Sequence, residues 1–211
     1  MIDTVIFDFD GTLANTNQMI INSFKHIYTE FLQRDCSEEY IMSTFGEPLE
    51  LTLTRDFEAF SFENVVSRYR DYQKDRFNEE VTLYETVEDT LEYLKNKNIK
   101  LGIATSRLRN STVSALKAFN IAKYFDIIVS ADDVTKHKPD KEPLIKAINE
   151  LGSTIESTLY VGDSRFDMEC ALNALATPVL VGWQLNSREL AIKYNIKHVL
   201  EKMWDLTDLI Q

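Results

Sequence analysis

The chain is predicted to be an α/β protein: a parallel sheet with helices on both faces, and a small helical insert after the first strand. Strand and helix patterns alternate from Val81 onward, which is typical of a parallel sheet covered on both sides. The region from Asp35 to about Glu80 lacks strand signals and carries helical ones. A short apolar run, Val5–Phe7, stands before these regions and ends at two carboxylates.

The first predicted strand positions a pair of acidic side chains. Val5-Ile6-Phe7 is apolar and β-favouring, as in a strand buried on both faces, and Asp8 and Asp10 follow at its end. In extended backbone, side chains two residues apart point the same way, and Gly11 allows a sharp turn just beyond them. Like charges at this separation require a cation between them or a proton on one of them, and both conditions suit catalysis.

The insert is predicted to be entirely helical. Thr16 can cap a helix from about residue 17 to 33, whose apolar residues recur at helical spacing. Ser37-Glu38-Glu39 opens a second helix, Gly46-Glu47-Pro48 breaks it, and two helical stretches follow. The aromatic residues of this region are expected to form its own core. They are Tyr40, Phe45, Phe57, Phe60, Phe62, Tyr69, Tyr72 and Phe77. The predicted division is therefore a core of residues 1–15 and 82–211 and an inserted cap of residues 16–81.

After Val81 each predicted helix precedes a strand, which indicates a Rossmann-like parallel sheet. The expected helices cover about residues 85–96, 108–119, 141–151, 165–175 and 187–194. The expected strands cover residues 99–104, 126–129, 158–161, 178–181 and 198–200, and a final helix contains Trp204 and Leu206.

Composition excludes several classes of protein. The 44% hydrophobic and 27% charged residues are ordinary for a globular protein, and the net charge of −11 disfavours nucleic acid as a partner. Because no apolar run approaches ~20 residues and no basic leader is visible, we expect a cytoplasmic protein without a membrane partner. Cys36 and Cys170 are too few for a disulfide framework or zinc site, so both are expected to be reduced packing thiols.

Two further stretches offer groups that bind phosphate. Thr105-Ser106-Arg107 follows a predicted strand and precedes a helix, where a hydroxyl and free amides can hold a phosphate oxygen. The alternative is simple capping of that helix. Lys138 lies before Pro139, which restricts the backbone of the residue before it, and a fixed lysine is a useful counter-charge for a phosphoryl group. The alternative here is a surface lysine beside a turn.

A third stretch, Gly162-Asp163-Ser164-Arg165-Phe166-Asp167, follows another predicted strand. Asp163 is expected at the same sheet edge as Asp8, and Asp167, four residues later, faces the same way one turn into a helix. Several carboxylate oxygens suit Mg²⁺, a hard ion that prefers oxygen ligands. The alternative is an acidic helix cap with a solvated neighbour.

Taken together, these motifs resemble one superfamily. The order Asp-x-Asp-Gly-Thr, Thr-Ser, Lys-Pro and Gly-Asp-x-x-x-Asp is similar to that of the haloacid dehalogenase (HAD) superfamily of aspartate-nucleophile phosphohydrolases. The insert after the first motif resembles the small α-helical cap of that superfamily, a plan shared by phosphoglycolate phosphatases, PpaX-like pyrophosphatases and β-phosphoglucomutases. The resemblance covers essentially the whole chain.

The resemblance implies a two-step phosphatase reaction with Mg²⁺ as cofactor. Asp8 would attack phosphorus to form an aspartyl-phosphate, and Asp10 would act as acid and then as base. The implied metal ligands are Asp8, the backbone carbonyl of Asp10, Asp163 and Asp167. The implied phosphate-binding residues are Thr105, Ser106 and Lys138. Gly46, Glu47 and Pro48 resemble the cap loop that helps to choose the substrate, although a turn between two helices is an equal alternative.

The implied substrate is a small phosphorylated molecule: a phosphoglycolate-like compound, a sugar phosphate or pyrophosphate. An acidic Glu47 in the cap loop counts mildly against phosphoglycolate. A phosphosugar mutase and a non-catalytic phosphate-binding regulatory module stay open as alternatives, whereas Asp10 and Thr12 favour a phosphatase over a dehalogenase and a mutase respectively. The expected assembly is a monomer or a weak homodimer. Ala14-Asn15-Thr16 and Leu83-Tyr84-Glu85-Thr86 depart from the common pattern at the two connections between core and cap.

Overall fold

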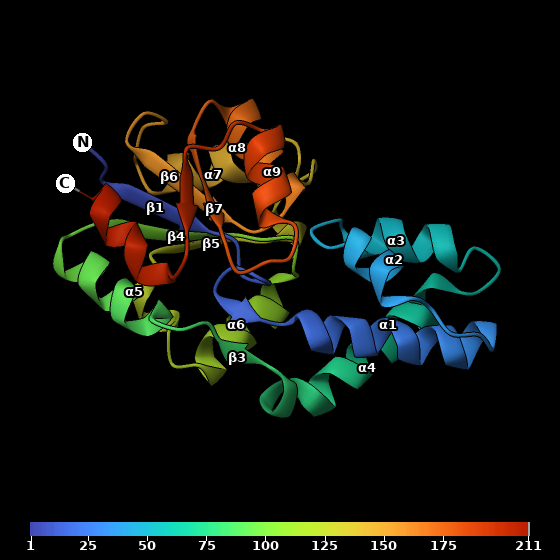
Figure 1. The fold of residues 1–211 in the computed structure, drawn as a ribbon. Coiled ribbons are helices and arrows are strands. Elements are labelled where there is room, and N and C mark those ends of the chain that lie inside the picture. The colour runs from blue at the N-terminus through green and yellow to red at the C-terminus, as the bar shows by residue number, and fades with distance from the viewer. Residues whose placement is uncertain (211) are drawn as a thin grey trace.

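A computed structural model describes residues 1–210 and contains a six-stranded parallel sheet of order β5-β4-β1-β6-β7-β8 (Figure 1). The strands are β1 (Thr4–Phe7), β4 (Lys100–Ala104), β5 (Ile127–Val129), β6 (Thr158–Gly162), β7 (Thr177–Val181) and β8 (His198–Leu200). All neighbours in this sheet pair in parallel. The predicted fold class is confirmed, and every predicted sheet strand lies within one or two residues of its expected position.

The strand order explains why the end of β1 is a natural site. β1 pairs with β4 on one side and with β6 on the other, so the direction of chain connection reverses at β1. In open parallel sheets, ligands bind in the crevice that this reversal creates at the carboxyl ends of the strands. Asp8 and Asp10 directly follow β1 and therefore stand at this crevice.

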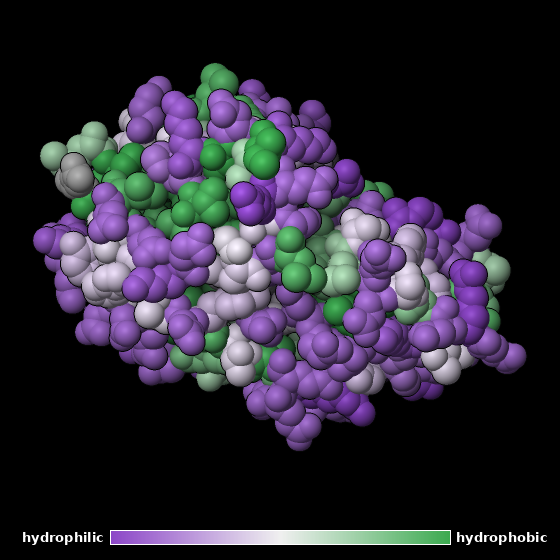
Figure 2. All heavy atoms as spheres, in the orientation of Figure 1, coloured by the Kyte–Doolittle hydropathy of each residue, from purple (hydrophilic) through white to green (hydrophobic). Residues whose placement is uncertain are grey.

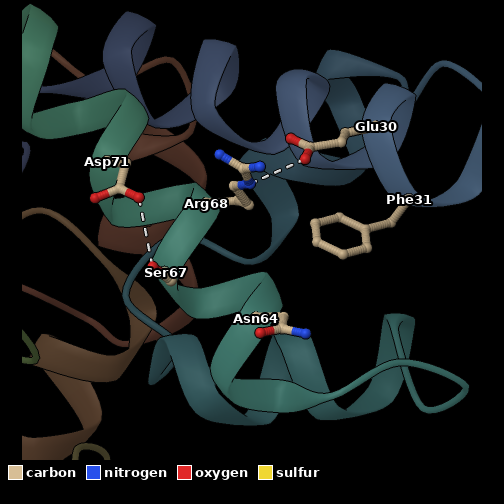
Figure 3. Close-up of a pocket in the computed structure, with 6 residues that line it drawn as sticks. All are labelled: Glu30, Phe31, Asn64, Ser67, Arg68 and Asp71. Atoms are coloured by element: carbon tan, nitrogen blue, oxygen red, sulfur yellow. Dashed lines mark hydrogen bonds and ion pairs between the residues drawn. The ribbon is translucent and has the colours of Figure 1, made fainter.

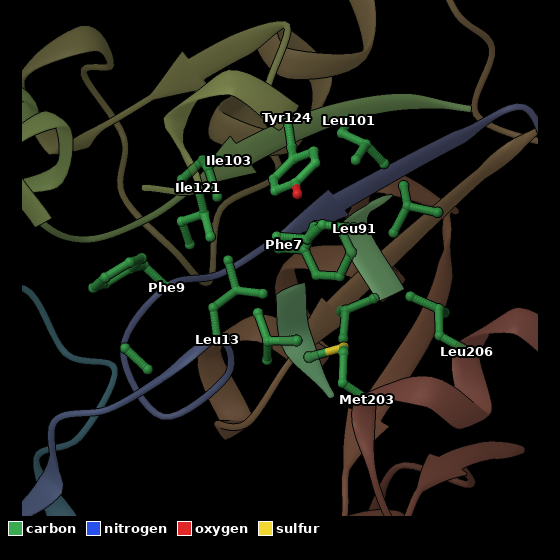
Figure 4. Packing of buried hydrophobic residues seen from close by; sticks show 14 of the residues in the cluster. Phe7, Phe9, Leu13, Leu91, Leu101, Ile103, Ile121, Tyr124, Met203 and Leu206 are labelled. Carbon is green, nitrogen blue, oxygen red and sulfur yellow. The ribbon is translucent and has the colours of Figure 1, made fainter. Parts of the chain in front are cut away.

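Alternating residues of β1 serve the two faces of the sheet. Val5 and Phe7 belong to a cluster that includes Leu91 and Leu206, whereas Ile6 belongs to the cluster on the other face with Tyr160. Figure 4 shows Phe7 packed among Leu91, Leu101, Tyr124 and Met203 in the first cluster. The helices beyond the insert are α5 (Val87–Asn96), α6 (Arg109–Ala118), α7 (Glu142–Glu150), α8 (Arg165–Ala174) and α9 (Ser187–Lys193). The expected final helix is a 3₁₀ helix, Met203–Leu209, and further 3₁₀ turns cover Ala122–Tyr124 and Ala131–Asp133.

The segment between β1 and β4 is helical, as predicted, and extends from one side of the sheet (Figure 1). It contains α1 (Asn17–Leu32), α2 (Glu38–Ser43), α3 (Leu49–Asp56) and α4 (Phe62–Glu80). These helices share a separate hydrophobic cluster, in which the rings of Phe24 and Tyr69 meet edge to face at 5.2 Å. The prediction of an aromatic core holds for Phe45, Phe57, Phe62 and Tyr69, but Tyr40 and Phe60 are exposed and Tyr72 is not part of this cluster. Phe77 packs instead against the cluster beside the sheet, 5.6 Å from Phe119.

Two details of the connections differ from expectation. Thr16 precedes α1, but its buried hydroxyl forms no capping hydrogen bond, so that prediction is wrong. The chain passes between the sheet and the helical segment through β2 (Ala14–Asn15) and β3 (Thr82–Leu83), which pair antiparallel with Asn15 opposite Thr82. Two-residue strands carry too little pattern to be predicted from sequence.

The visible surface is mainly hydrophilic with scattered hydrophobic patches (Figure 2). This matches a chain whose 34 acidic residues outnumber its 23 lysines and arginines. Within residues 1–210, no helix combines the length and apolarity needed to cross a bilayer.

Candidate active site

Three neighbouring strands bring the predicted site residues to one edge of the sheet. Asp8 follows β1, Thr105 follows β4, and Asp163 follows β6; all three are buried. One carboxylate oxygen from each of Asp8, Asp163 and Asp167 lies within 4.8 Å of the other two. The structure thus assembles carboxylates that are up to 159 positions apart in the chain, since 167 − 8 = 159.

Gly11 makes this close approach possible. Its φ of +74° lies in the left-handed region, and a Cβ there would be 2.3 Å from Asp163 Oδ2. Any side chain at this position would displace the Asp163 carboxylate. The Gly11 carbonyl also accepts hydrogen bonds from Trp183 Nε1 at 2.9 Å and Gln184 Nε2 at 3.0 Å, which anchors the turn to the loop after β7.

Lys138 is buried between two of the carboxylates. Its Nζ lies 2.6 Å from Asp167 Oδ1 and 3.1 Å from Asp8 Oδ1. Burial alone would lower the pKa of the Lys138 ammonium, but the charges of Asp167 and Asp8 outweigh it and raise that pKa. Lys138 is therefore a fixed positive charge and not the surface lysine of the alternative interpretation.

Asp8 has a buried carboxylate oxygen without a hydrogen bond. Burial raises its pKa to about 7, the charge of Lys138 opposes this shift, and the charges of Asp167 and Asp10 add to it. Although Lys138 Nζ is 3.1 Å away, Asp8 Oδ1 forms no hydrogen bond of acceptable geometry with any described residue. A buried carboxylate oxygen in this condition can accept a further cation or attack an electrophile.

Asp167 is held more completely than its neighbours. Its Oδ2 accepts hydrogen bonds from the Ser164 amide at 3.0 Å and hydroxyl at 2.6 Å, which forms a capping box at the start of α8. Its Oδ1 accepts from the Tyr160 hydroxyl at 3.0 Å as well as from Lys138. Burial opposes ionisation, but Lys138 and these hydrogen bonds dominate and lower the pKa of Asp167. Asp167 is fully buried, which contradicts the alternative of a solvated neighbour.

The environment of Asp163 disfavours its ionised form. Burial first, and then the charges of Asp167 and Asp8, raise the pKa of its carboxyl well above the ordinary value. The nearest hydroxyl donor, Thr12 Oγ1, is 3.4 Å from Asp163 Oδ1. Three buried carboxylates close together, of which Lys138 pairs with only two, suit a hard divalent cation, because such an ion binds oxygen ligands and relieves their repulsion. The residues therefore fit Mg²⁺.

Asp10 lies at the more accessible side of the site. Its carboxylate is 24% exposed, and Arg107 Nη1 donates to its Oδ1 at 2.8 Å. The Arg107 guanidinium also lies 5.4 Å from the centre of the Phe9 ring. Sequence reasoning gave Arg107 no role, because its partner is 97 residues away and no local pattern links them.

Of the remaining predicted residues, Thr105, Ser106 and Gly46 lie at this edge, whereas Pro48 directly precedes α3. Thr105 Oγ1 accepts from the Arg107 amide at 3.3 Å, and Ser106 Oγ donates to the Gly46 carbonyl at 3.4 Å. This second bond joins the turn between α2 and α3 to the sheet edge. Glu47 lies in that turn, but its carboxylate accepts from Thr52 Oγ1 at 2.6 Å and from Arg55 Nη1 at 3.2 Å. The charge of Glu47 is therefore neutralised within the helical segment.

A separate hollow of about 420 Å³ lies between α1 and α4 (Figure 3). Its charged groups are largely paired with each other or with nearby polar groups: Arg68 Nε is 3.0 Å from Glu30 Oε1, and Ser67 donates to Asp71 at 3.4 Å. None of the predicted site residues lines this hollow, which is therefore separate from the carboxylate cluster at the sheet edge.

The chain is similar to known proteins over nearly its whole length. Residues 5–181 match the family described as haloacid dehalogenase-like hydrolase. A pyrophosphatase PpaX of Bacillus mycoides is 36% identical over 209 residues, which cover 99% of this chain and 97% of that protein. The pyrophosphatase PpaX of Halalkalibacterium halodurans is 34% identical, with coverage of 99% and 97%. A solved haloacid dehalogenase-like hydrolase from Bacteroides fragilis has a TM-score of 0.86 and 27% identity, covering 98% of this chain and 100% of that one.

Proposed function

The chain belongs to the haloacid dehalogenase-like hydrolases, and on this premise we propose that it is a Mg²⁺-dependent phosphatase with Asp8 as its nucleophile. We further propose that it forms an aspartyl-phosphate and acts on a small phosphorylated molecule, with pyrophosphate first among the candidates. The observation that carries the proposal is the buried cluster of Asp8, Asp163 and Asp167, in which Lys138 pairs with Asp8 and Asp167. The names of the PpaX relatives support pyrophosphate as the substrate.

Asp8 and Asp10 divide the chemistry of the first step. The ionised Asp8 attacks phosphorus, the bond from phosphorus to the leaving oxygen breaks, and Asp10 gives its proton to that oxygen. In the second step Asp10 takes a proton from a water molecule, which attacks phosphorus and releases orthophosphate from Asp8. The greater exposure of Asp10 fits this exchange with water and with a leaving group.

The other residues supply fixed charge and hydrogen bonds. Lys138, the Thr105 hydroxyl and the Ser106 amide would bind the oxygens of the transferred phosphoryl group, while Tyr160 and Ser164 hold Asp167 and thereby Lys138 in place. A Mg²⁺ bound by Asp8, the Asp10 carbonyl and Asp163, with Asp167 as a direct or water-mediated contributor, would supply charge neutralisation and Lewis-acid polarisation of the phosphoryl oxygens.

We propose that residues 16–81 act as a cap over this site. The bond from Ser106 to the Gly46 carbonyl and the short β2–β3 connection support a segment that closes on the sheet edge and opens around its two crossings. Closure would exclude bulk water and favour small substrates over proteins.

The test is orthophosphate release from pyrophosphate, phosphoglycolate, sugar phosphates, nucleotides and p-nitrophenyl phosphate, measured with Mg²⁺ and with EDTA. We expect turnover of at least one small phosphate with Mg²⁺ and none with EDTA. The substitution Asp8→Asn should lower kcat by about 10³-fold or more, because it removes the nucleophile. Asp89→Asn, an exposed aspartate on α5, is the matched control. Full activity of Asp8→Asn would refute the proposal.

A further inference from the structure

Arg107 is a largely but not fully buried cation beside the proposed acid, and the reaction scheme gives it no task. Its side chain is only 12% exposed, Nη1 donates to Asp10 at 2.8 Å, and Nη2 donates to Ser111 Oγ at 2.5 Å. Nε is buried and has no acceptor among the described residues. Leaving a buried donor unpaired is costly, so the guanidinium is not optimised for the contacts it makes.

Arg107 lies where the leaving group of the substrate would lie, and we call this part of the site the leaving side. Asp10 protonates the leaving oxygen in the proposed reaction, so the leaving group must lie beside the Asp10 carboxylate. Arg107 Nη1 is in hydrogen-bond contact with that carboxylate and is therefore beside the leaving group as well. Lys138, in contrast, is already committed to Asp8 and Asp167 on the side of the transferred phosphoryl group.

The helical segment contacts this edge of the sheet, because Ser106, the residue before Arg107, donates to the Gly46 carbonyl at 3.4 Å. Tyr69 of α4 is buried, and the pKa of its hydroxyl is raised, first by burial and then by the charge of Asp10, while the charge of Arg107 opposes the shift. The charges of Asp10 and Arg107 therefore both influence Tyr69 of α4. A leaving group next to Asp10 would lie against side chains that are only 12% (Arg107) and 24% (Asp10) exposed, where an unpaired second charge would be costly.

We propose that Arg107 binds a second anionic group on the leaving side of the substrate and thereby selects substrates whose leaving group is itself a phosphate, such as pyrophosphate. The planar guanidinium has donors beyond those used by Asp10 and Ser111, so it can bridge Asp10 and a phosphate oxygen. This inference rests on the proposed function, because it takes the leaving side from the role of Asp10.

The inference is tested by binding and does not require turnover. Two non-hydrolysable ligands, methylenediphosphonate and methylphosphonate, differ in the second anionic group. Their dissociation constants would be measured by calorimetry at a fixed excess of free Mg²⁺. We expect the wild-type protein to bind the diphosphonate at least about tenfold more tightly. Arg107→Met should weaken diphosphonate binding by about 10- to 100-fold, as expected for loss of a charge-assisted hydrogen bond, and methylphosphonate binding by less than about threefold.

Two further variants make the result specific. Arg107→Lys keeps the charge without the planar fork and should recover part of the diphosphonate preference. Lys136→Met removes an exposed lysine, 4.0 Å from Asp140, and should leave both dissociation constants unchanged. Equal weakening of both ligands by Arg107→Met, or no weakening of either, would overturn the inference. A wild-type protein that binds the diphosphonate through Arg107 but hydrolyses no phosphate would instead refute the proposed function alone.

Discussion

Asp163 shows at the scale of one residue how a proposed metal ligand reduces the stability of the metal-free protein. Its folded-state pKa lies above the ordinary value of 3.8, chiefly because burial disfavours the charged form. The contribution of the Asp163 carboxyl to the free energy of unfolding is therefore greatest below its unfolded-state pKa. It falls as the pH rises, because the unfolded chain then binds fewer protons than the folded one.

The substitution Asp163→Asn should remove this penalty. In EDTA at pH 7.5 we expect the variant to be more stable than the wild type by about 0.5–2 kcal/mol, the usual range for a stabilising substitution at a functional site. The advantage should shrink toward pH 4, because the carboxyl of the unfolded wild-type chain then also begins to be protonated. Chemical denaturation at several pH values measures it, with the exposed Asp89→Asn as control. Lower stability of Asp163→Asn in EDTA at pH 7.5 would contradict this account.

The same scale shows which site residues a sequence can reveal. Asp8, Asp163 and Lys138 stand at the ends of recognisable strands or before a proline, so local pattern predicts that they meet. The capping box from Ser164 to Asp167 has a local signature that could have been used. Tyr160 and Arg107 have none, because each depends on a partner set by packing: the Tyr160 hydroxyl reaches the Ala104 carbonyl at 2.9 Å across the sheet.

At the scale of elements, the turn between α2 and α3 depends on one glycine. Gly46 has a φ of +82°, and a Cβ there would lie 2.5 Å from Ser164 Oγ and 2.9 Å from Phe166 Cδ2. The turn therefore approaches the start of α8 as closely as a backbone without side chain allows. Gly152, after α7, offers a comparison, since its φ is +59° but a Cβ there would meet nothing within 4 Å.

We expect Gly46→Ala and Gly152→Ala to differ in their effect on activity. Gly152→Ala should cost about 1 kcal/mol of stability, because alanine is strained at positive φ, and Gly46→Ala should cost more, because its Cβ would also displace Ser164. Only Gly46→Ala should lower kcat/KM, by about tenfold or more, since the turn can no longer sit against Ser164 and the proposed cap closes imperfectly. Thermal denaturation and initial rates with the same substrate measure both effects. Equal kcat/KM values for the two variants would show that this contact has no part in catalysis.

Long helices and strands were predictable because their periodic pattern extends over many residues. The α4 helix of 19 residues and the buried five-residue strands carry a clear pattern, whereas β2 and β3 have two residues each and exist through pairing with one another. Phe77 was assigned to the helical segment's core on its position in the sequence, but α4 extends far enough back to bring this ring against Phe119. Such contacts depend on where a helix ends in space.

At the scale of the whole molecule, the packing suggests two bodies with a narrow connection. The cluster of α1–α4 is distinct from the two clusters that flank the sheet. Met19 and Val81 are exceptions, because they lie in the helical segment or next to it and are buried against the sheet. The division into a core and a residue 16–81 cap stays a prediction that these contacts support.

Removing the proposed cap tests this division directly. Asn15 and Thr82 are paired in an antiparallel ladder, so a two-residue Asn-Gly turn can replace residues 16–81 without moving either strand. We expect the shortened protein to unfold cooperatively, at a lower temperature because Met19 and Phe77 no longer cover the sheet, and to be stabilised by Mg²⁺ through Asp8 and Asp163. Pyrophosphate turnover should fall by about 10²-fold or more, because water then enters the site and the leaving side has no cover. Circular dichroism with and without Mg²⁺ and orthophosphate release measure these outcomes, with the intact chain as reference. A shortened protein with no cooperative transition would show that sheet and helices form one folding unit, whereas unchanged turnover would show that the helices play no part in closing the site.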